Sequence, residues 1–475
     1  MSKKIDKTMP FFKYLTICMV IVTIITLALF KFIDILPGEY FLVLCVLLGL
    51  LTVLFSSLIL VRNGRKRKGI GTVLSIIYII LLILVIIYEL NTIGFLKKIG
   101  FKNYKTENYS ILVLKDSNYG QLNDLDEKQI GSLIFDNDGL KKARDKINNK
   151  ISTKFVTFDD VNLVKDALLN GKVDAMLIEN SILAILSESD EEFSLIYKNI
   201  YEFSIDIETE DITNEVDITN SPFNIYVSGI DTYGAVNSVS RSDVNMVITV
   251  NPNTHKILIT SIPRDYYVEL YGKNAKDKLT HAGIYGVENS AKTVEQLLGI
   301  EINYYVKVNF SSVIKVVDAL DGVNVYSKYK FTSRDGYKYN VGYNYVNGKK
   351  ALSFVRERKS FAGGDRVRVE NQAALIKALI DKAVSPAILT NYNNLLNALS
   401  DLFITNLDTK DITKFIKMQV ADMPNWEIDN YSLNGRDAYG TTYTYGSQQL
   451  YVMIPNEETV INAKNNINNL MKKED

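Results

Sequence analysis

The chain has 475 residues with 54 basic and 54 acidic side chains, so no overall basic charge points to nucleic acid. Hydrophobic residues make up 47%, and the longest apolar runs lie within the first hundred residues. Both cysteines, Cys18 and Cys45, lie in these runs, which excludes a disulfide, a cysteine nucleophile or a zinc–cysteine site from the rest of the chain. With two histidines, a three-histidine metal site is excluded as well.

Three apolar runs predict transmembrane helices at 14–33, 41–61 and 69–88, within a membrane anchor formed by residues 1–96. Each run is close to the roughly 20 residues that a membrane-spanning helix needs, and Lys31 can extend its charge toward the interface. Buried core helices are a weaker interpretation, because uncharged runs of this length are rare in soluble folds. A cleaved signal peptide is also disfavoured, because two more runs follow the first.

The distribution of basic residues predicts the orientation. Lysines precede the first run and basic residues fill loop 62–68, whereas loop 34–40 has neither Lys nor Arg. Positive charge stays inside, so we expect a multi-pass protein of the cell membrane with a cytoplasmic N-terminus and extracellular C-terminal domains. Three lysines after the last run oppose the rule but could meet lipid phosphates: Lys97, Lys98 and Lys102. Because no ATP is available outside, chemistry there must use an activated substrate.

Residues 103–210 alternate short strand and helix patterns, which predicts a small α/β accessory domain. The phrase at 167–178 loosely resembles the strand–helix units of extracellular solute-binding proteins. A spacer role is nevertheless the preferred interpretation, because a fold does not establish a function. The acidic, polar stretch at 208–221 is interpreted as a linker.

A second α/β domain is predicted at 222–386, with a C-terminal extension at 387–475 that packs against it. Strands are expected at 223–230, 244–250, 256–262, 304–308 and 352–358, and helices around 287–298, 310–320 and 369–384. This order predicts a mixed central sheet with an antiparallel edge. The predicted fold is therefore three transmembrane helices followed by two extracellular α/β domains.

Two carboxylates lie near the ends of predicted strands. Asp231 follows the first strand of the second domain, and Asp243 precedes the next one. Adjacent strand ends could bring both carboxylates together, and hard oxygen ligands suit magnesium. An equally good interpretation makes Asp231 a turn residue and Asp243 a strand cap.

Several cationic residues could form a cradle for pyrophosphate. Arg264 follows a strand, while Arg356 and Arg358 are two apart and would share a face if they lie in a strand. Asp365, Arg368 and Gln372 have the spacing of one helix face near a helix N-terminus, which favours anions. Guanidinium groups bind phosphate oxygens in a fork, although each arginine alone could instead form a surface salt bridge.

The two histidines are better explained by structural roles than by catalysis. His281 follows Lys278 in a polar turn region, where a satisfied structural histidine is the preferred interpretation. His255 lies in a predicted hairpin loop and is expected to be solvated.

A series of motifs in this domain resembles the LytR-CpsA-Psr family. The motifs lie in order at 229–232, 241–243, 261–268, 276–278, 294–300, 318–323, 355–358 and 364–368. The three spans, the accessory domain and the segments at 404–406, 423–426 and 450–455 resemble the CpsA-type capsule proteins of Gram-positive bacteria. One departure is Asn371, where many relatives have an arginine before the glutamine.

The resemblance implies a phosphotransferase that attaches a capsular or other anionic glycopolymer, carried on polyprenyl pyrophosphate, to peptidoglycan outside the cell. It implies an apolar tunnel for the polyprenyl chain, Mg²⁺ (with Mn²⁺ as an alternative) on Asp231 and Asp243, and catalytic roles for Arg264, Arg356 and Asp365. The implied pyrophosphate ligands are Arg264, Arg356, Arg358, Arg368 and Gln372, with Lys278 and Arg241 also matching the pattern.

The expected partners are the lipid-linked polysaccharide, peptidoglycan and the membrane, with capsule polymerase, export or kinase proteins as further candidates. Nucleic acid is not expected, because the short cytoplasmic segments encode no DNA-binding domain. Two other functions remain open. The chain could sense the lipid-linked precursor without turnover and regulate capsule assembly, or it could hydrolyse the carrier as a pyrophosphatase.

Overall fold

The computed structural model describes residues 9–60, 64–98, 104–134, 138–230, 236–309, 313–361, 363–385 and 402–472, together with 395, 398 and 399. The chain divides into two compact units. The first contains Met1–Ile99, Pro386–Ser400 and Asp408–Asn425, and the second contains Gly100–Ser385, Asp401–Leu407 and Trp426–Asp475. The predicted extension at 387–475 is therefore divided between the two units.

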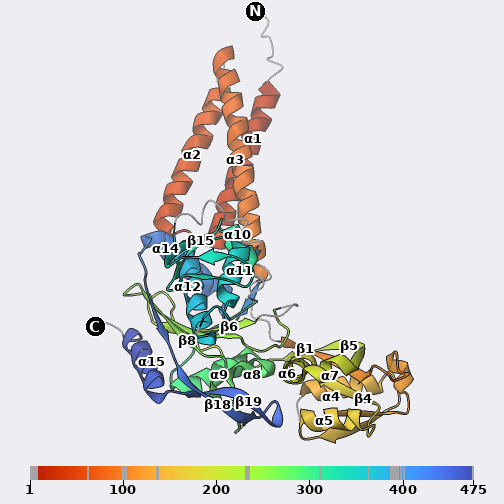
Figure 1. Ribbon diagram of the computed structural model, residues 1–475. Helices are drawn as coiled ribbons and strands as arrows, with labels where there is room; N and C mark the ends of the chain where they lie inside the picture. Colours follow the sequence, from red (N-terminus) through yellow and green to blue (C-terminus); the bar gives the residue numbers. More distant parts are fainter. Residues whose placement is uncertain are drawn as a thin grey trace, which may run out of the picture. The chain divides into compact units, whose positions relative to one another are not determined.

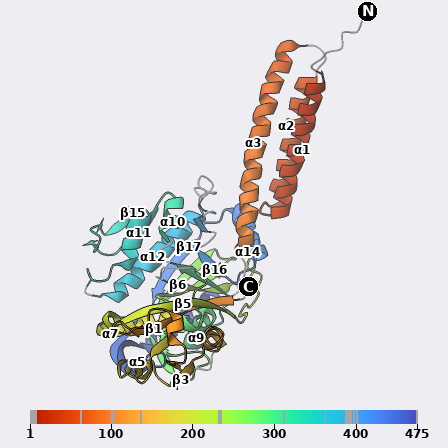
Figure 2. The ribbon, with the colours of Figure 1, turned by 90° about the vertical axis from the view of Figure 1, so that its right-hand side faces the viewer.

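The first unit contains the three predicted spans as long helices, which lie side by side in Figures 1 and 2. They are α1 (Met9–Ile33), α2 (Gly38–Leu60) and α3 (Arg65–Lys98), and each is long and apolar enough to cross a membrane. The third helix extends ten residues beyond the predicted end at 88. A further helix, α14 (Thr409–Asp422), belongs to the same unit and is capped by the Asp408 side chain.

Polar side chains hold the three long helices together. Thr23 Oγ1 lies 3.1 Å from Thr52 Oγ1, and the Tyr78 hydroxyl lies 3.2 Å from Thr52 Oγ1 and 3.3 Å from Thr23 Oγ1. Gly71 permits close packing of α3 on α2, because a Cβ atom there would lie 2.7 Å from the Cβ of Leu58. Hydrogen bonds and small residues are the usual means of helix association in lipid, where the hydrophobic effect does not drive it.

The accessory domain of the second unit is a five-stranded sheet in the order β3-β2-β4-β1-β5, with β1 and β5 antiparallel. Its apolar core joins the sheet to its helices. The elements are β1 (Tyr104–Leu114), η1 (Leu122–Leu125), β2 (Gln129–Leu133), α4 (Asp138–Asn148), β3 (Lys154–Phe158), α5 (Val161–Leu169), β4 (Ala175–Glu179), α6 (Asn180–Ser189), α7 (Glu191–Ile196) and β5 (Tyr197–Glu208).

The predicted linker after β5 has no regular secondary structure, but it is packed. Ile212 and Ile218 are buried. The backbone N–H of Asn214 donates to the carbonyl of Asn303 over 3.1 Å. This segment is therefore a fixed connection to the next domain rather than a free tether.

The next domain contains a six-stranded mixed sheet in the order β16-β11-β6-β7-β8-β17. Strand β6 is parallel to β11 and antiparallel to β7, and β8 is parallel to β17, so the predicted mixed sheet is confirmed. The strands are β6 (Phe223–Ile230), β7 (Val244–Asn251), β8 (Lys256–Ile262), β11 (Tyr304–Asn309), β16 (Phe403–Thr405) and β17 (Glu427–Ser432). Both edge strands come from the C-terminal extension.

Helices cover both faces of this sheet. Figure 1 shows α9 (Val287–Leu298) and α15 (Glu457–Leu470) on one face and α12 (Asp365–Ala383) on the other. The apolar face of α9 packs on Tyr226 and Val247, and the predicted Gly299 ends α9 in the left-handed conformation at φ 58°. The remaining elements are β9 (Tyr267–Glu269), β10 (Lys276–Lys278), α8 (Leu279–Ala282), η2 (Gly283–Tyr285), α10 (Val313–Ala319), β12 (Val323–Ser327), β13 (Phe331–Thr332), β14 (Lys338–Tyr339), β15 (Gly342–Val346), α11 (Gly348–Arg356), β18 (Gly435–Thr442) and β19 (Gly446–Pro455).

One predicted strand is wrong. Residues 348–356 form helix α11, which the Asn347 side chain caps by accepting from the N–H of Lys350. The short apolar run at 352–355 suits either a strand or a buried helix segment, and the N-terminal cap decides for the helix. The argument that Arg356 and Arg358 share a strand face therefore fails.

We expect Tyr78→Phe to destabilise the helical bundle, because it removes the hydroxyl that joins Thr23 and Thr52. Hydrogen bonds between membrane helices contribute about 0.6–2 kcal/mol, so the free energy of unfolding in detergent should fall by about that amount. Tyr88→Phe on the same helix is the control, because its side chain is exposed. Equal stability of the two variants would contradict this role of Tyr78.

Candidate functional site

The end of β8 and the start of β7 bring Arg264 and Asp243 together. The two strands are antiparallel with Asn245 opposite Ile262, so residues just outside this pair are neighbours. Arg264 Nη1 donates to Asp243 Oδ1 over 2.7 Å, and both side chains are largely buried. Asp243 therefore lies directly before β7, as expected, and also forms an ion pair with Arg264.

Asp265 joins two cations at the same point. Its Oδ2 lies 3.5 Å from Arg264 Nε, and its Oδ1 lies 3.1 Å from Lys278 Nζ. Burial alone would raise the pKa of Asp265, but the charges of Arg264, Lys278 and Arg368 outweigh it and hold that pKa below its usual value. A buried charge is tolerated only when it is paired, so Asp265 fixes the positions of its partners.

Helix α12 adds residues from its N-terminal half. Arg368 lies near its start, and its positive charge contributes to lowering the pKa of Asp265. Gln372 follows one turn later and is only 4% exposed. Its Oε1 accepts no hydrogen bond from any residue in the described part of the chain, which is unusual for a buried polar atom. We refer to Asp243, Arg264, Asp265, Lys278 and Arg368 as the charge cluster.

Asp365 is the first residue of α12, after Gly364 with φ 51°. The helix therefore begins four residues before the predicted start at 369, while the side chain of Asp365 lies outside the described part of the structure. The predicted placement of Asp365, Arg368 and Gln372 along one helix is therefore confirmed for the backbone. The free N–H groups and dipole of this helix end favour an anion.

Arg356 and Arg358 are exposed at and just beyond the end of α11. The buried carboxylate of Glu357 lies between them and accepts from the backbone N–H groups of Arg334 (2.6 Å) and Ser360 (3.0 Å). Burial would raise the pKa of Glu357, but these hydrogen bonds lower it on balance. The turn after α11 is thus held by Glu357, and the phosphate-binding roles of both arginines stay predictions from the resemblance.

Arg241 is paired with an acid from the accessory domain. Its Nη1 forms a short hydrogen bond and ion pair with Glu188 of α6. Burial would raise the pKa of Glu188, but the bond and charge of Arg241, together with the charges of Arg264 and Lys278, lower it. The accessory domain therefore places a carboxylate at the margin of the charge cluster, which the sequence did not reveal.

His281 is buried and has the structural role that was predicted. Its Nδ1 lies 2.6 Å from Asp277 Oδ1, and Asp277 also accepts from the backbone N–H groups of Lys278 and Thr444. Burial would raise the pKa of Asp277, but the interaction with His281 and these hydrogen bonds lower it. The network anchors the backbone of Lys278 and thereby supports its contact with Asp265.

The predicted magnesium site is described only in part. Asp231 lies outside the described residues, and the Oδ1 of Asp243 is occupied by Arg264. Its Oδ2 receives no hydrogen bond from the described residues, so it remains a suitable hard donor. Within the described ranges there is no group of three His, Cys, Asp or Glu residues that could hold a metal ion. The cation therefore stays a prediction.

The sequence argument gave no role to Asp265, although it lies beside Arg264 at a strand end, and it did not consider Glu188. Asp265 follows Arg264 directly, so the adjacent opposite charges after a strand were its available signal. Glu188 carries no local signal, because its contact with Arg241 depends on how two domains pack.

Comparison with known proteins gives consistent matches to this domain. Residues 194–459 match the model of the LytR_cpsA_psr family. A polyisoprenyl-teichoic acid–peptidoglycan teichoic acid transferase TagU of Enterococcus faecalis is 37% identical over 205 residues, which is 42% of this chain and 67% of the relative. The same-named protein of Bacillus anthracis is 39% identical over 189 residues, which is 40% of this chain and 61% of the relative. The crystal structure of B. subtilis TagV aligns with 54% of this chain and 100% of its own, at 26% identity and a TM-score of 0.45.

We expect Glu188→Gln to strengthen the binding of inorganic pyrophosphate, because it frees Arg241 from a competing carboxylate. Partly exposed ion pairs are worth about 0.2–1 kcal/mol, so affinity should rise by a factor of about 1.5 to 5. Calorimetric titration of the full chain in nanodiscs measures the effect. Glu192→Gln, which removes an exposed charge from the neighbouring helix, should leave affinity unchanged. Weaker binding by Glu188→Gln would contradict competition.

Proposed function

This chain belongs to the LytR_cpsA_psr family, and we propose that it is a phosphotransferase that moves an anionic glycopolymer from a polyprenyl-pyrophosphate carrier to peptidoglycan. The observation that carries the proposal is the charge cluster, which joins Arg264, Lys278 and Arg368 beside a helix N-terminus. The names of the relatives describe transfer of teichoic acid from a polyisoprenyl carrier to peptidoglycan, and the proposal extends that class of reaction to this chain. A capsular polysaccharide is the proposed polymer.

The proposed reaction uses the energy of the donor's own phosphoanhydride. A hydroxyl oxygen of the acceptor attacks the phosphorus attached to the glycan and forms a new phosphoester bond. The anhydride P–O bond breaks, and polyprenyl phosphate leaves with the bridging oxygen and its electron pair. The hydroxyl proton passes to a carboxylate, for which Asp365 is the candidate, and then to solvent. No ATP is consumed. This suits the domain built on the six-stranded sheet, called the family domain below, which we propose lies outside the cell.

The residues of the chain act by positioning and charge neutralisation. Arg264, Lys278 and Arg368 would bind non-bridging phosphoryl oxygens, where preorganised charges stabilise the transition state. Gln372 has a buried carbonyl oxygen that could accept a hydrogen bond from the substrate. Mg²⁺ held by Asp231 and Asp243 would supply further neutralisation of pyrophosphate charge. The proposed remaining pyrophosphate ligands are Arg241, beside Glu188, and Arg356 and Arg358 at and just beyond the end of α11.

The function is tested by supplying the full chain in nanodiscs with a synthetic polyprenyl-pyrophosphate oligosaccharide, peptidoglycan fragments and magnesium. We expect mass spectrometry to detect the oligosaccharide joined through phosphate to the acceptor. Free oligosaccharide phosphate alone would indicate hydrolysis. Intact donor in a stoichiometric complex would indicate a sensor.

We expect Arg368→Ala to reduce transfer about 10²- to 10³-fold, the usual effect of removing one donor to a transition-state oxyanion. Arg366→Ala is a matched control, because this arginine lies two residues earlier on α12 and instead contacts Gly435 and Asp437. Its rate should stay within about two-fold, since exposed ion pairs contribute little. Equal rates for the two variants would refute the role of Arg368.

We expect Arg356→Ala to abolish transfer, because it removes a proposed pyrophosphate ligand. The fold should stay intact, because substitutions of exposed side chains usually change stability little. Circular dichroism and thermal unfolding establish the fold, and product formation measures transfer. Lys359→Ala on the same exposed turn is the control. Normal turnover by a folded Arg356→Ala protein would remove this residue from the proposed site.

A further inference from the structure

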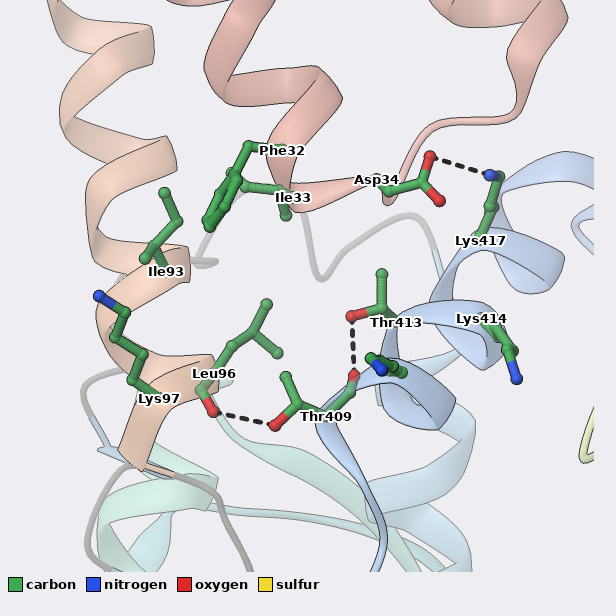
Figure 3. Close-up of a pocket in the computed structure, with 11 residues that line it drawn as sticks. Phe32, Ile33, Asp34, Ile93, Leu96, Lys97, Thr409, Thr413, Lys414 and Lys417 are labelled. Carbon is green, nitrogen blue, oxygen red and sulfur yellow. Dashed lines mark hydrogen bonds and ion pairs between the residues drawn. The ribbon is translucent and has the colours of Figure 1, made fainter.

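A pocket of about 490 Å³ lies within the first unit, at the end of the helical bundle from which α3 continues into the rest of the chain. Its walls come from the end of α1, the end of α3 and one side of α14. Figure 3 shows Phe32 and Leu96 pointing into the space between these helices, with Thr413 on the opposite side. The size lies in the range of about 300–1,000 Å³ that is typical of ligand pockets.

The pocket has one apolar wall and one cationic wall. Phe32, Ile33, Ile93 and Leu96 supply the apolar side, at the end of two helices that are apolar enough to cross a membrane. The cationic residues are Lys97 of α3 and Lys410, Lys414 and Lys417 of α14, while Asp34 is the only acid among the lining residues that are described. The lining therefore has an excess of positive charge.

The cationic side is built by helix periodicity. Thr409, Lys410, Thr413, Lys414 and Lys417 are spaced so that they share one side of α14. The position of α14 is fixed by three contacts within the unit. Thr409 Oγ1 donates to the Leu96 carbonyl over 3.3 Å, Lys417 Nζ lies 3.0 Å from Asp34 Oδ1, and the Tyr40 hydroxyl donates to the Ala421 carbonyl over 3.1 Å.

Two of the four lysines form an ion pair with a carboxylate in the described part of the chain, and the other two do not. Lys417 is paired with Asp34, and Lys414 is paired with Asp411 over 2.9 Å. Lys97 and Lys410 form no ion pair with any residue that the structure describes, and both are exposed. Figure 3 shows the Lys97 ammonium directed away from the pocket, so an anion in the pocket would meet it once the long Lys97 side chain rotates inward.

We propose that this pocket binds the headgroup phosphate of an anionic phospholipid from the membrane leaflet on the side of the family domain. Charge complementarity favours an anion, and the apolar wall, which continues into the spans, favours one that carries acyl chains. A soluble anion would make no use of Phe32 and Ile93. This lipid site is separate from the transfer reaction and does not depend on it. It also explains why lysines that oppose the positive-inside rule occur at this end of α3.

The test uses the full chain in nanodiscs made from equal amounts of phosphatidylcholine and phosphatidylglycerol, followed by native mass spectrometry of the lipids that stay bound. We expect phosphatidylglycerol to be retained selectively. A basic residue near an anionic surface is worth about 1 kcal/mol, so each lysine removed should lower retention about five-fold. The double variant Lys97→Gln/Lys410→Gln should show the combined loss, and Lys97→Arg/Lys410→Arg should retain binding.

The matched control is Lys128→Gln/Lys154→Gln, which removes two exposed lysines from the accessory domain and should leave retention unchanged. Equal retention of both lipids by the unaltered protein would overturn the proposal, and so would unchanged selectivity in Lys97→Gln/Lys410→Gln. A further arm adds polyprenyl phosphate in an amount equal to phosphatidylglycerol. Preferential retention of polyprenyl phosphate through Lys97 and Lys410 would overturn the assignment to a bulk phospholipid.

Discussion

A buried carboxylate cannot stay charged without partners, and Asp265 imposes this constraint where four parts of the family domain meet. It holds Arg264 after β8 and Lys278 at the end of β10, and it interacts electrostatically with Arg368 on α12. Its own backbone carbonyl accepts from the N–H of Met453 on β19 over 2.7 Å. The cations of the candidate site are therefore positioned by the same contacts that stabilise the surrounding fold, so a phosphoryl group would meet charges that are already in place.

The membrane helices and the mixed sheet could be predicted because both leave strong patterns in the sequence. Long uncharged runs define α1, α2 and α3, and the alternation of strands and helices defines the domain around β6, β7 and β8. The error at α11 arose because the three apolar residues at 352–355 fit both a strand and a helix periodicity, and the deciding cap at Asn347 lies outside that run. The pairing of β16 and β17 with opposite edges was not predictable, since no local pattern specifies a partner strand about 100 residues away for β16 or about 170 residues away for β17.

In the candidate site, too, residues that lie in local sequence motifs could be predicted, whereas a contact between distant parts of the chain could not. Arg264, Asp243 and Lys278 lie in recognisable motifs, and the structure brings them together. Arg368 and Gln372 could be placed on one helix by spacing alone. Glu188 could not be found, because its pairing with Arg241 depends on the packing of two domains. The interpretation of the accessory domain as a spacer therefore misses the ion pair that Glu188 of α6 contributes to Arg241.

The edges of the central sheet have a consequence for biogenesis. Strands β16 and β17 begin at Phe403 and Glu427, so the sheet cannot be completed until most of the chain has been synthesised. The polypeptide also enters the membrane unit between these two strands, at α14, before it returns to the sheet. In the proposed orientation, β8 and β11 would be outside the cell before β17 and β16 are available to pair with them. Unpaired strand edges of this kind are prone to aggregate. Secretion-associated chaperones would then be most needed during translocation of the last quarter of the chain.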